Sequence, residues 1–235
     1  SIESLAGCDF SLFRKDIKTL RKRFPAGRQP LDYGIKAAKL ELLKKIYEHS
    51  STDLKDRKFA AFRKKQAGWL TDYAVFKALK TKFNQAGWPD WPAEYRMKDP
   101  SAIEQFAAEY ATEVLFNEWL QWQLYEQFAD AKRHAAKNGI LLMGDMPFLV
   151  SRDSADVWAH QGYFKLNLSS GAPPDLYFAQ GQRWGMPPYD WARIAADGYG
   201  YLVRKMQYLE NFFDLYRVDH FVGMFRLWTI LLTEP

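Results

Sequence analysis

ILLMGD (residues 140–145) and LYRVD (residues 215–219) are two short apolar stretches that each end in an aspartate. Runs of this length are typical of buried β-strands. The sequence between them predicts a short helix at about 153–159, a loop rich in Gly and Pro at 171–191, and a helix at about 199–213. A strand, a helical connection and a second strand form a βαβ unit, which indicates an α/β fold with a parallel sheet or barrel.

The chain before this region reads as mainly helical. Apolar spacing predicts helices at about 9–24, 34–49, 53–67, 71–84 and 101–137. Thr71 and Asp72 are suited to an N-cap for the fourth helix, and Gly139 to the stop after the fifth. Trp119 and Trp122 lie three residues apart in the longest helix, so we expect both to be core residues.

Composition excludes several classes of protein. The 235 residues are 48% hydrophobic and 26% charged, a balance typical of a globular protein. Charges interrupt every apolar run before it reaches the length of a membrane span, and the N-terminus does not resemble a signal peptide. The single cysteine, Cys8, excludes an intrachain disulfide and a multi-thiolate metal site. We expect a cytoplasmic protein without a metal or other cofactor.

Positive charge gathers near the N-terminus. The net charge is +5, and the surplus lies in the first 65 residues. The segment RKDIKTLRKR (14–23) has amphipathic-helix spacing, so its charges are expected to form a solvated helix face. The alternative is an RNA-binding helical module, for which steep salt dependence would be the signature. No nucleic-acid motif accompanies the segment.

The two strand-end aspartates, Asp145 and Asp219, are candidate functional groups. In (β/α)₈ barrels the residues at the carboxyl ends of strands face the active site. The alternative is that each aspartate caps the loop that follows it. Arg217 alternates to the same side of its strand as Asp219 and would hold that carboxylate ionised. An ionised carboxylate in a sugar pocket can act as a nucleophile.

Five motifs in a fixed order carry a resemblance to a known family. They are GDMPF (144–148), DSADVW (153–158), GAPPD (171–175), GQRWGMPPY (181–189) and RVDHF (217–221). This succession resembles the 4-α-glucanotransferases of glycoside hydrolase family 77, also called amylomaltases or disproportionating enzymes. Other α-glucan barrel enzymes share a strand-end Arg-x-Asp but lack the Gly-Gln-x-Trp-Gly-x-Pro loop.

The resemblance implies part of a (β/α)₈ barrel with a large helical insertion. Residues 1–138 would form the mainly helical insertion subdomain, and residues 139–235 would supply central barrel strands and the active-site loop. The implied activity moves α-1,4-glucan chains to the 4-hydroxyl of an acceptor by a retaining double displacement. Asp219 matches the nucleophile and Arg217 the arginine that supports it. The family's general acid/base Glu has no match here, so we expect the chain alone to be inactive.

The resemblance also implies a set of substrate contacts. Asp145 matches a substrate-contacting aspartate, and Leu176 stands where relatives often have an aromatic. Tyr73 matches a tyrosine associated with longer glucans, for which helix packing is the alternative. The full set of implied substrate-binding residues is Asp145, Asp175, Tyr177, Gln182, Trp184, His220 and Tyr73.

The implied partners are α-1,4-glucans, such as maltodextrins and chains derived from starch or glycogen. Neither nucleic acid nor a membrane is expected, and the remaining segments of the barrel itself are the protein partner that the resemblance suggests. The competing hypothesis is a non-catalytic α-glucan-binding fragment, distinguished by whether a covalent glycosyl intermediate can form at Asp219.

Overall fold

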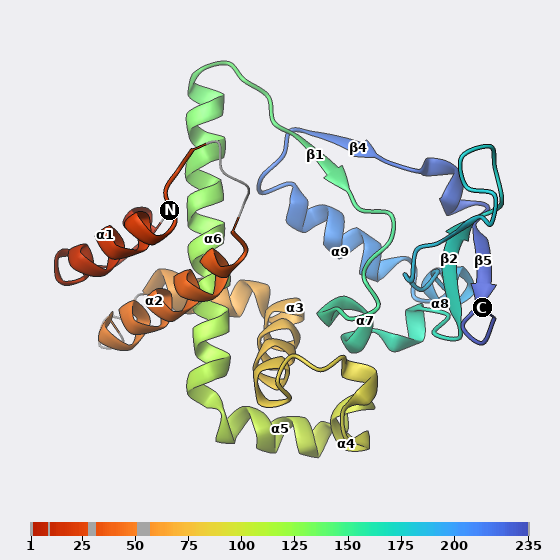
Figure 1. The fold of residues 1–235 in the computed structure, drawn as a ribbon, viewed down its shortest axis with the longest axis horizontal. Coiled ribbons are helices and arrows are strands. Elements are labelled where there is room, and N and C mark those ends of the chain that lie inside the picture. Colours follow the sequence, from red (N-terminus) through yellow and green to blue (C-terminus); the bar gives the residue numbers. More distant parts are fainter. Residues whose placement is uncertain (1, 9, 28–31, 51–56, 235) are drawn as a thin grey trace. The chain divides into compact units, whose positions relative to one another are not determined.

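The computed structural model describes residues 2–8, 10–27, 32–50 and 57–234 of the chain. It contains both helices and strands (Figure 1). The chain divides into two compact units, each built from two separate stretches of sequence. The first unit comprises residues 1–74 and 112–127, and the second comprises residues 75–111 and 128–235.

Helices dominate the chain up to residue 137, as the sequence predicts. The elements are α1 (Arg14–Arg23), α2 (Gly34–Ser50), α3 (Arg57–Lys82), α4 (Ala93–Arg96), α5 (Pro100–Glu109) and α6 (Ala111–Lys137), with 3₁₀ turns at Ile2–Ser4, Ser11–Phe13 and Trp88–Asp90. Among these described helices, none is long and apolar enough to cross a membrane.

Helix α3 is one continuous element where the sequence predicts two helices, at 53–67 and 71–84. Residues 53–56 of the first prediction lie outside the described residues. Thr71 and Asp72 lie inside α3, so the predicted N-cap is wrong. Leu70 and Ala74 on either side of them are fully buried. Packing along this face therefore outweighs the local preference of Thr and Asp for a helix start.

The long helix predicted at 101–137 is interrupted at Tyr110, which separates α5 from α6. Asp99 caps α5, because its carboxylate accepts the backbone N–H groups of Ser101 and Ala102. The Tyr110 ring stacks on Phe106 with centroids 4.5 Å apart. Because Phe106 is 1% exposed, a packed aromatic pair lies at the break between α5 and α6.

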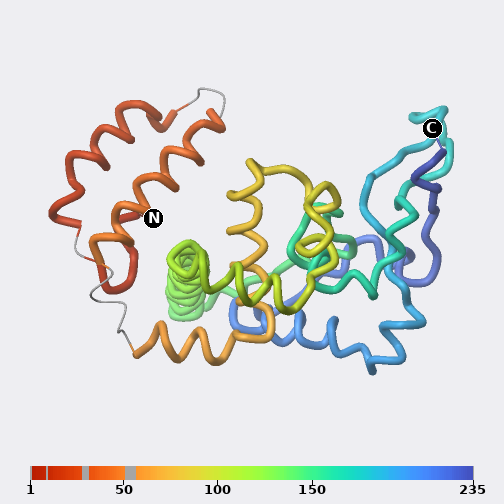
Figure 2. Tube along the Cα trace, turned by 90° about the horizontal axis from the view of Figure 1, so that it is seen from below, coloured from red at the N-terminus to blue at the C-terminus, as the bar shows by residue number. Residues whose placement is uncertain are grey.

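The first unit has a continuous hydrophobic core. Trp119 and Trp122 of α6 are both buried in it, which confirms their prediction as core residues. Helices α1 and α2 lie side by side, at the red end of the tube in Figure 2. The buried members of this core are Leu5, Ile17, Leu42, Ile46, Tyr47, Phe59, Phe62, Leu70, Phe116, Trp119 and Trp122.

The second unit contains the predicted parallel strand pair. Strand β1 (Met143–Met146) pairs with β4 (Leu215–Val218), and the register places Asp145 opposite Arg217. Helices α7 (Ala155–Ala159), α8 (Trp191–Ala196) and α9 (Gly200–Leu209) lie between these strands in the sequence. The βαβ prediction is thereby confirmed for this part of the chain.

Strand β1 begins three residues later than predicted. Gly139 has φ +68, and the Ile140 N–H donates to the Ala135 carbonyl, so these residues complete the C-terminus of α6. The backbone N–H of Leu142 then donates to the Asp214 carboxylate and lowers the pKa of that carboxyl. The residues before Met143 therefore belong to the connection that follows the C-terminus of α6 and not to the strand. The side chain of Leu141 in this connection is 68% exposed.

A second sheet replaces part of the loop predicted at 171–191. Strand β2 (Leu168–Ala172) pairs in antiparallel fashion with β3 (Gln182–Arg183) and with β5 (Trp228–Leu231). Gly181 turns the chain into β3 with φ +74, and a Cβ there would lie 2.7 Å from the Ala172 carbonyl oxygen. The predicted loop is thus a hairpin with a long tip.

Aromatic rings form much of the core of the second unit. Trp158 of α7 is fully buried, and its indole N–H donates to the Tyr95 carbonyl at 2.8 Å. Phe76 lies against both Trp91 and Trp158. Lys80 is also buried, and its ammonium group contacts Asp153 at 2.6 Å. These contacts fix the segment that follows β1, which carries part of the candidate site.

Candidate active site

The ends of β1 and β4 bring two charged side chains together. The Arg217 guanidinium donates two hydrogen bonds to the Asp145 carboxylate, from Nε to Oδ1 and from Nη2 to Oδ2, each 2.6 Å long. The parallel register places the two residues directly opposite each other. Both side chains are 56% exposed, so the pair is open to solvent on one side. This bidentate geometry is the strong form of an arginine–carboxylate pair.

Arg217 is linked to Asp219 through charge. The pKa of Arg217 is raised, first by its hydrogen bonds to Asp145 and then by the negative charges of Asp145 and Asp219. The Arg217 guanidinium therefore interacts electrostatically with two carboxylates, and it donates its hydrogen bonds to Asp145. The sequence pairs Arg217 with Asp219 and does not predict the contact with Asp145. The supporting role of Arg217 stays a prediction.

A cavity of about 540 Å³ opens at these strand ends. Its volume falls within the range that small-molecule sites occupy, about 300–1,000 Å³. Four of its lining residues are candidates that the sequence singles out: Asp145, Trp184, Asp219 and His220. The complete lining is Asp145, Met146, Pro147, Phe148, Leu149, Trp184, Asp219 and His220.

His220 contacts two aromatic rings. Its centroid lies 5.5 Å from that of Phe148 and 5.6 Å from that of Trp184. The His220 backbone adopts the left-handed conformation, with φ +49. Gly223 makes room for this arrangement, because a Cβ there would lie 2.4 Å from His220 Cδ2 and 2.6 Å from Phe148 Cε1.

We expect Gly223→Ala to displace His220 from the cavity wall and to lower the free energy of unfolding by roughly 1–3 kcal/mol, the scale of overpacking. Gly68→Ala is the matched control, because Gly68 lies in α3 and a Cβ there would meet nothing within 4 Å. That control should be neutral or stabilise by about 0.5–1 kcal/mol. Urea denaturation of both variants measures the difference, and equal stabilities would contradict the role given to Gly223.

Trp184 lies in a turn that hydrogen bonds hold to strand β2. Its backbone N–H donates to the Ser170 carbonyl, and the next N–H, of Gly185, donates to the Ser169 hydroxyl. Both serines are fully buried. The indole N–H donates to the side-chain oxygen of Gln182 at 3.1 Å. Gln182 therefore contacts the site through Trp184 and is not itself among the described lining residues.

Two further candidates lie at the tip of the hairpin. The Asp175 carboxylate accepts the backbone N–H groups of Tyr177 and Phe178 and so shapes its own turn. The side chain of Tyr177 is 90% exposed and that of Leu176 is 100% exposed. Asp175 and Tyr177 are not among the described residues that line the cavity, so their binding roles stay predictions.

Tyr73 belongs to the first unit. It is half-buried in α3, where its ring meets Trp69 at a centroid distance of 6.1 Å. Burial raises the pKa of its hydroxyl, and a hydrogen bond with Gln121 opposes that shift. These contacts agree with the helix-packing alternative, and its role toward longer glucans is untested.

Phe148 is one of the four lining residues that the sequence does not assign to the site. It lies against His220 on one side and against Tyr189 on the other. Tyr189 is buried beside Tyr201, and burial raises the pKa of both hydroxyls. The GDMPF motif contains Phe148, so its position two residues after the strand end was the available signal.

The described residues contain no group of three or more His, Cys, Asp or Glu side chains suited to a metal ion. The groups that converge on the cavity are two carboxylates, a guanidinium beside them, an imidazole and an indole. Such a set can bind a polar ligand with C–H faces through hydrogen bonds and ring stacking. It also presents a carboxylate, Asp219, as an oxygen nucleophile.

Comparison with known proteins gives consistent matches. The family model described as 4-alpha-glucanotransferase, glycoside hydrolase family 77, matches residues 3–234. The curated 4-alpha-glucanotransferase of Chlamydia caviae is 38% identical, and the match covers 83% of this chain and 37% of that relative. The curated 4-alpha-glucanotransferase of Thermus thermophilus is 37% identical, and the match covers 90% of this chain and 44% of that relative. The amylomaltase from Streptococcus agalactiae, solved in complex with acarbose, superposes with a TM-score of 0.84 at 25% identity, covering 97% of this chain and 49% of that one. The chain thus spans less than half the length of these relatives.

Proposed function

Because the chain belongs to the 4-alpha-glucanotransferase family, we propose that it is the segment of such an enzyme that carries the nucleophile. The enzyme transfers α-1,4-glucan chains from a donor glucan to the 4-hydroxyl of an acceptor glucan or glucose. The observation that supports this most is the cavity at the ends of β1 and β4, where Asp219 of the family motif lies with Asp145, Trp184 and His220.

The proposed reaction is a retaining double displacement. An oxygen of the Asp219 carboxylate attacks C1 of the glucosyl unit, the bond from C1 to the leaving O4 breaks, and a proton donor protonates that oxygen. The covalent glucosyl ester is then attacked by the 4-hydroxyl of the acceptor, which loses its proton to the same group. This scheme needs a second carboxyl group about 5–5.5 Å from the nucleophile.

We assign that proton donor to a Glu in a part of the enzyme beyond this chain. The described lining has two carboxylates, Asp145 and Asp219, and Asp145 is already engaged by Arg217. Both carboxylate oxygens of Asp145 already accept hydrogen bonds from Arg217, which leaves this group poorly placed to protonate the leaving oxygen. The much greater length of the relatives leaves room for the missing group.

The proposed fold of the whole enzyme is a (β/α)₈ barrel. Strands β1 and β4 would be two of its parallel strands, and residues 1–138 would form the helical insertion subdomain. The parallel pairing and the likeness to the Streptococcus amylomaltase support this assignment. The single cysteine fits a cytoplasmic location, where glucan metabolism would supply maltodextrins.

The remaining residue roles follow from position. Arg217 holds Asp145 ready for the sugar and balances the charge of Asp219. Trp184 offers a ring face to the sugar, and Gln182 orients that ring. The hairpin tip with Asp175 and Tyr177 covers part of the glucan, His220 forms the wall, and Tyr73 contributes to binding longer chains.

Incubating the complete enzyme with maltotriose tests the proposal. Transfer predicts glucose together with maltodextrins longer than the substrate, seen by chromatography of the products. Release of glucose and maltose without longer chains would indicate a hydrolase instead. Binding of maltodextrins without turnover would favour the non-catalytic glucan-binding alternative.

We expect Trp184→Ala to weaken glucan binding more than it weakens the fold. The ring lines the cavity and is only partly buried, and its loss removes a stacking surface worth about 1 kcal/mol, by analogy with aromatic pairs. Calorimetric titration with a maltodextrin measures the affinity, and thermal unfolding measures the stability. A large loss of stability with unchanged affinity would make Trp184 a core residue.

A further inference from the structure

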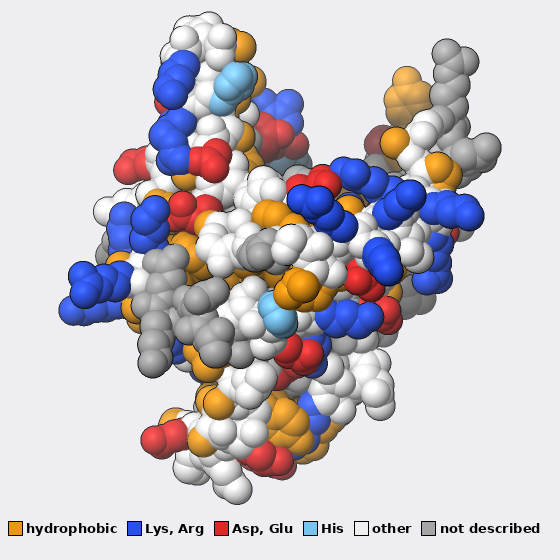
Figure 3. Space-filling model, turned by 90° about the vertical axis from the view of Figure 1, so that its left-hand side faces the viewer, with side chains coloured by type: hydrophobic (Ala, Val, Ile, Leu, Met, Phe, Trp, Pro, Cys, Tyr) orange, Lys and Arg blue, Asp and Glu red, His pale blue; other side chains and the backbone are white. Residues whose placement is uncertain are grey.

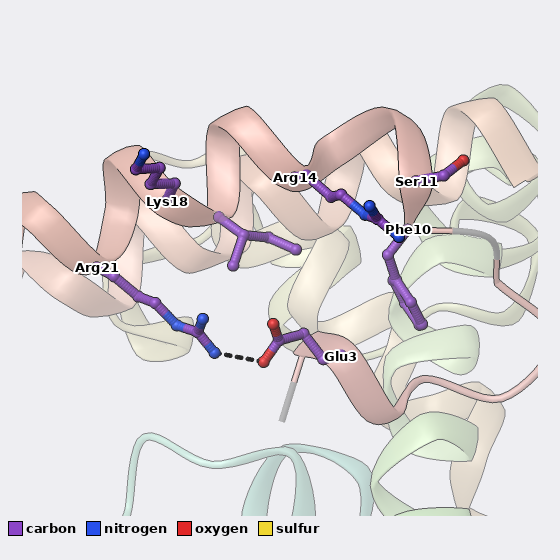
Figure 4. A pocket seen from close by; sticks show the side chains of 7 residues that line it. Glu3, Phe10, Ser11, Arg14, Lys18 and Arg21 are labelled. Atoms are coloured by element: carbon purple, nitrogen blue, oxygen red, sulfur yellow. Dashed lines mark hydrogen bonds and ion pairs between the residues drawn. The ribbon is translucent and has the colours of Figure 1, made fainter.

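A second cavity lies in the first unit, along helix α1. Its volume is about 520 Å³, and its lining comes from α1 and from the two 3₁₀ turns that precede it (Figure 4). The lining residues are Glu3, Phe10, Ser11, Arg14, Ile17, Lys18 and Arg21. The glucanotransferase activity proposed above does not use this cavity.

Three cations of α1 reach the cavity from one face of the helix. Arg14, Lys18 and Arg21 are spaced by four and three residues, and residues at these intervals are neighbours on a helix surface. In the space-filling view of Figure 3, Lys and Arg side chains (blue) lie in several groups, with Asp and Glu side chains (red) among them. Glu3 is the one acid among the described lining residues, so the lining carries a formal charge of +2.

Contacts within the lining give the cavity a defined shape. Arg21 Nη2 lies 2.5 Å from Glu3 Oε2, and Figure 4 shows these side chains directed at one another. Ile17, which lies between the cations in the helix, is 7% exposed and is an apolar residue of the lining.

We propose that this cavity binds a small organic phosphate, a phosphate monoester on a compact polar carbon skeleton such as a hexose. A phosphate monoester carries about two negative charges at neutral pH, which matches the +2 lining. Guanidinium groups bind phosphate oxygens in a two-pronged geometry, and Lys18 adds a point charge. Phe10 and Ile17 supply the apolar surface against which the carbon skeleton packs.

The same helix provides the matched control. Lys15 and Lys22 are exposed cations of α1 that do not line the cavity. The test variant is Arg14→Gln with Lys18→Gln, and the control is Lys15→Gln with Lys22→Gln, so both lose two positive charges. A third variant, Glu3→Gln, removes the acid of the lining. Circular dichroism verifies that each variant retains its helices.

Calorimetric titration of the complete enzyme with glucose 6-phosphate, inorganic phosphate, glucose and a single-stranded oligonucleotide tests the proposal. We expect glucose 6-phosphate to bind more tightly than inorganic phosphate, any glucose binding to be unaffected by substitutions in α1, and added salt to weaken the phosphate binding. The Arg14/Lys18 variant should bind at least about tenfold more weakly, the scale of one lost charge-assisted hydrogen bond. The Lys15/Lys22 variant should be close to unchanged, and Glu3→Gln should bind more tightly.

Three results would overturn the proposal. The first is absence of glucose 6-phosphate binding, and the second is equal weakening in the test and control variants, which would indicate diffuse attraction to α1. The third is tight oligonucleotide binding lost equally in both variants, which would favour the RNA-binding alternative. None of these measurements depends on glucan transfer, so their failure is distinct from failure of the proposed function.

Discussion

Asp219→Asn in the complete enzyme is expected to abolish both glucosyl transfer and hydrolysis while glucan binding is retained. The amide keeps the shape of the side chain but cannot form the glucosyl ester. We expect a loss of roughly 10⁴-fold or more in kcat, the scale seen when a residue of a covalent catalytic unit is removed. Product analysis with maltotriose measures turnover, and calorimetric titration measures binding.

A direct readout accompanies this prediction. A fluorinated glucosyl donor that traps covalent intermediates should add one glucosyl mass to the parent enzyme and none to the Asp219→Asn variant. Asp130→Asn is the control, because Asp130 is an exposed residue of α6 paired with Arg133. Normal disproportionation of maltotriose by the Asp219 variant would remove this residue from the role of nucleophile.

Arg217→Gln is expected to lower kcat/KM by roughly 10²–10³-fold, the scale for losing one preorganised electrostatic contact. The change removes both hydrogen bonds to Asp145 and leaves the carboxylates of Asp145 and Asp219 without the cation between them. The pair is half exposed, so stability should change little. Steady-state kinetics and thermal unfolding of the same preparation separate the two effects.

Two variants calibrate that result. Arg193→Gln removes a cation that pairs with Asp190 at 3.8 Å in α8 and should leave kcat/KM unchanged. The double variant of Asp145→Asn with Arg217→Gln should lose less than the sum of the two single losses, because the residues contact each other. Additive losses, or normal activity of Arg217→Gln, would mean that the ion pair has no role in the reaction.

Local sequence patterns predicted the parts of the fold that depend on nearby residues. The helix ranges near α2 and α9, the strand at β4 and the burial of Trp119 follow from periodicity alone. The continuity of α3 through Thr71 does not, because it depends on packing of the buried residues around it. Strand β5 was missed because its partner, β2, lies about 60 residues earlier, and pairing over that distance leaves no local signal.

The sequence predicted which residues belong to the candidate site better than it predicted which of them contact each other. Asp145, Trp184, Asp219 and His220 line one cavity, as their motif positions suggested. The pairing of Arg217 with Asp145 instead depends on the parallel register of β1 and β4, which the sequence leaves open. The sequence did not assign Phe148 to the site because an apolar residue near a strand end is usually a core residue. Its place in the cavity lining and its contact with His220 appear only in the structure.

The ion pair between β1 and β4 has a consequence for the order of folding. Asp145 and Arg217 are separated by 72 positions, so their contact closes a long loop that includes α7, α8 and α9. Closing such a loop costs entropy that is recovered only when the intervening segments pack. We therefore expect the contact between Asp145 and Arg217 to form late in folding, after those helices. Substitutions that slow their packing would reduce the fraction of active molecules while leaving the rate of each active molecule unchanged.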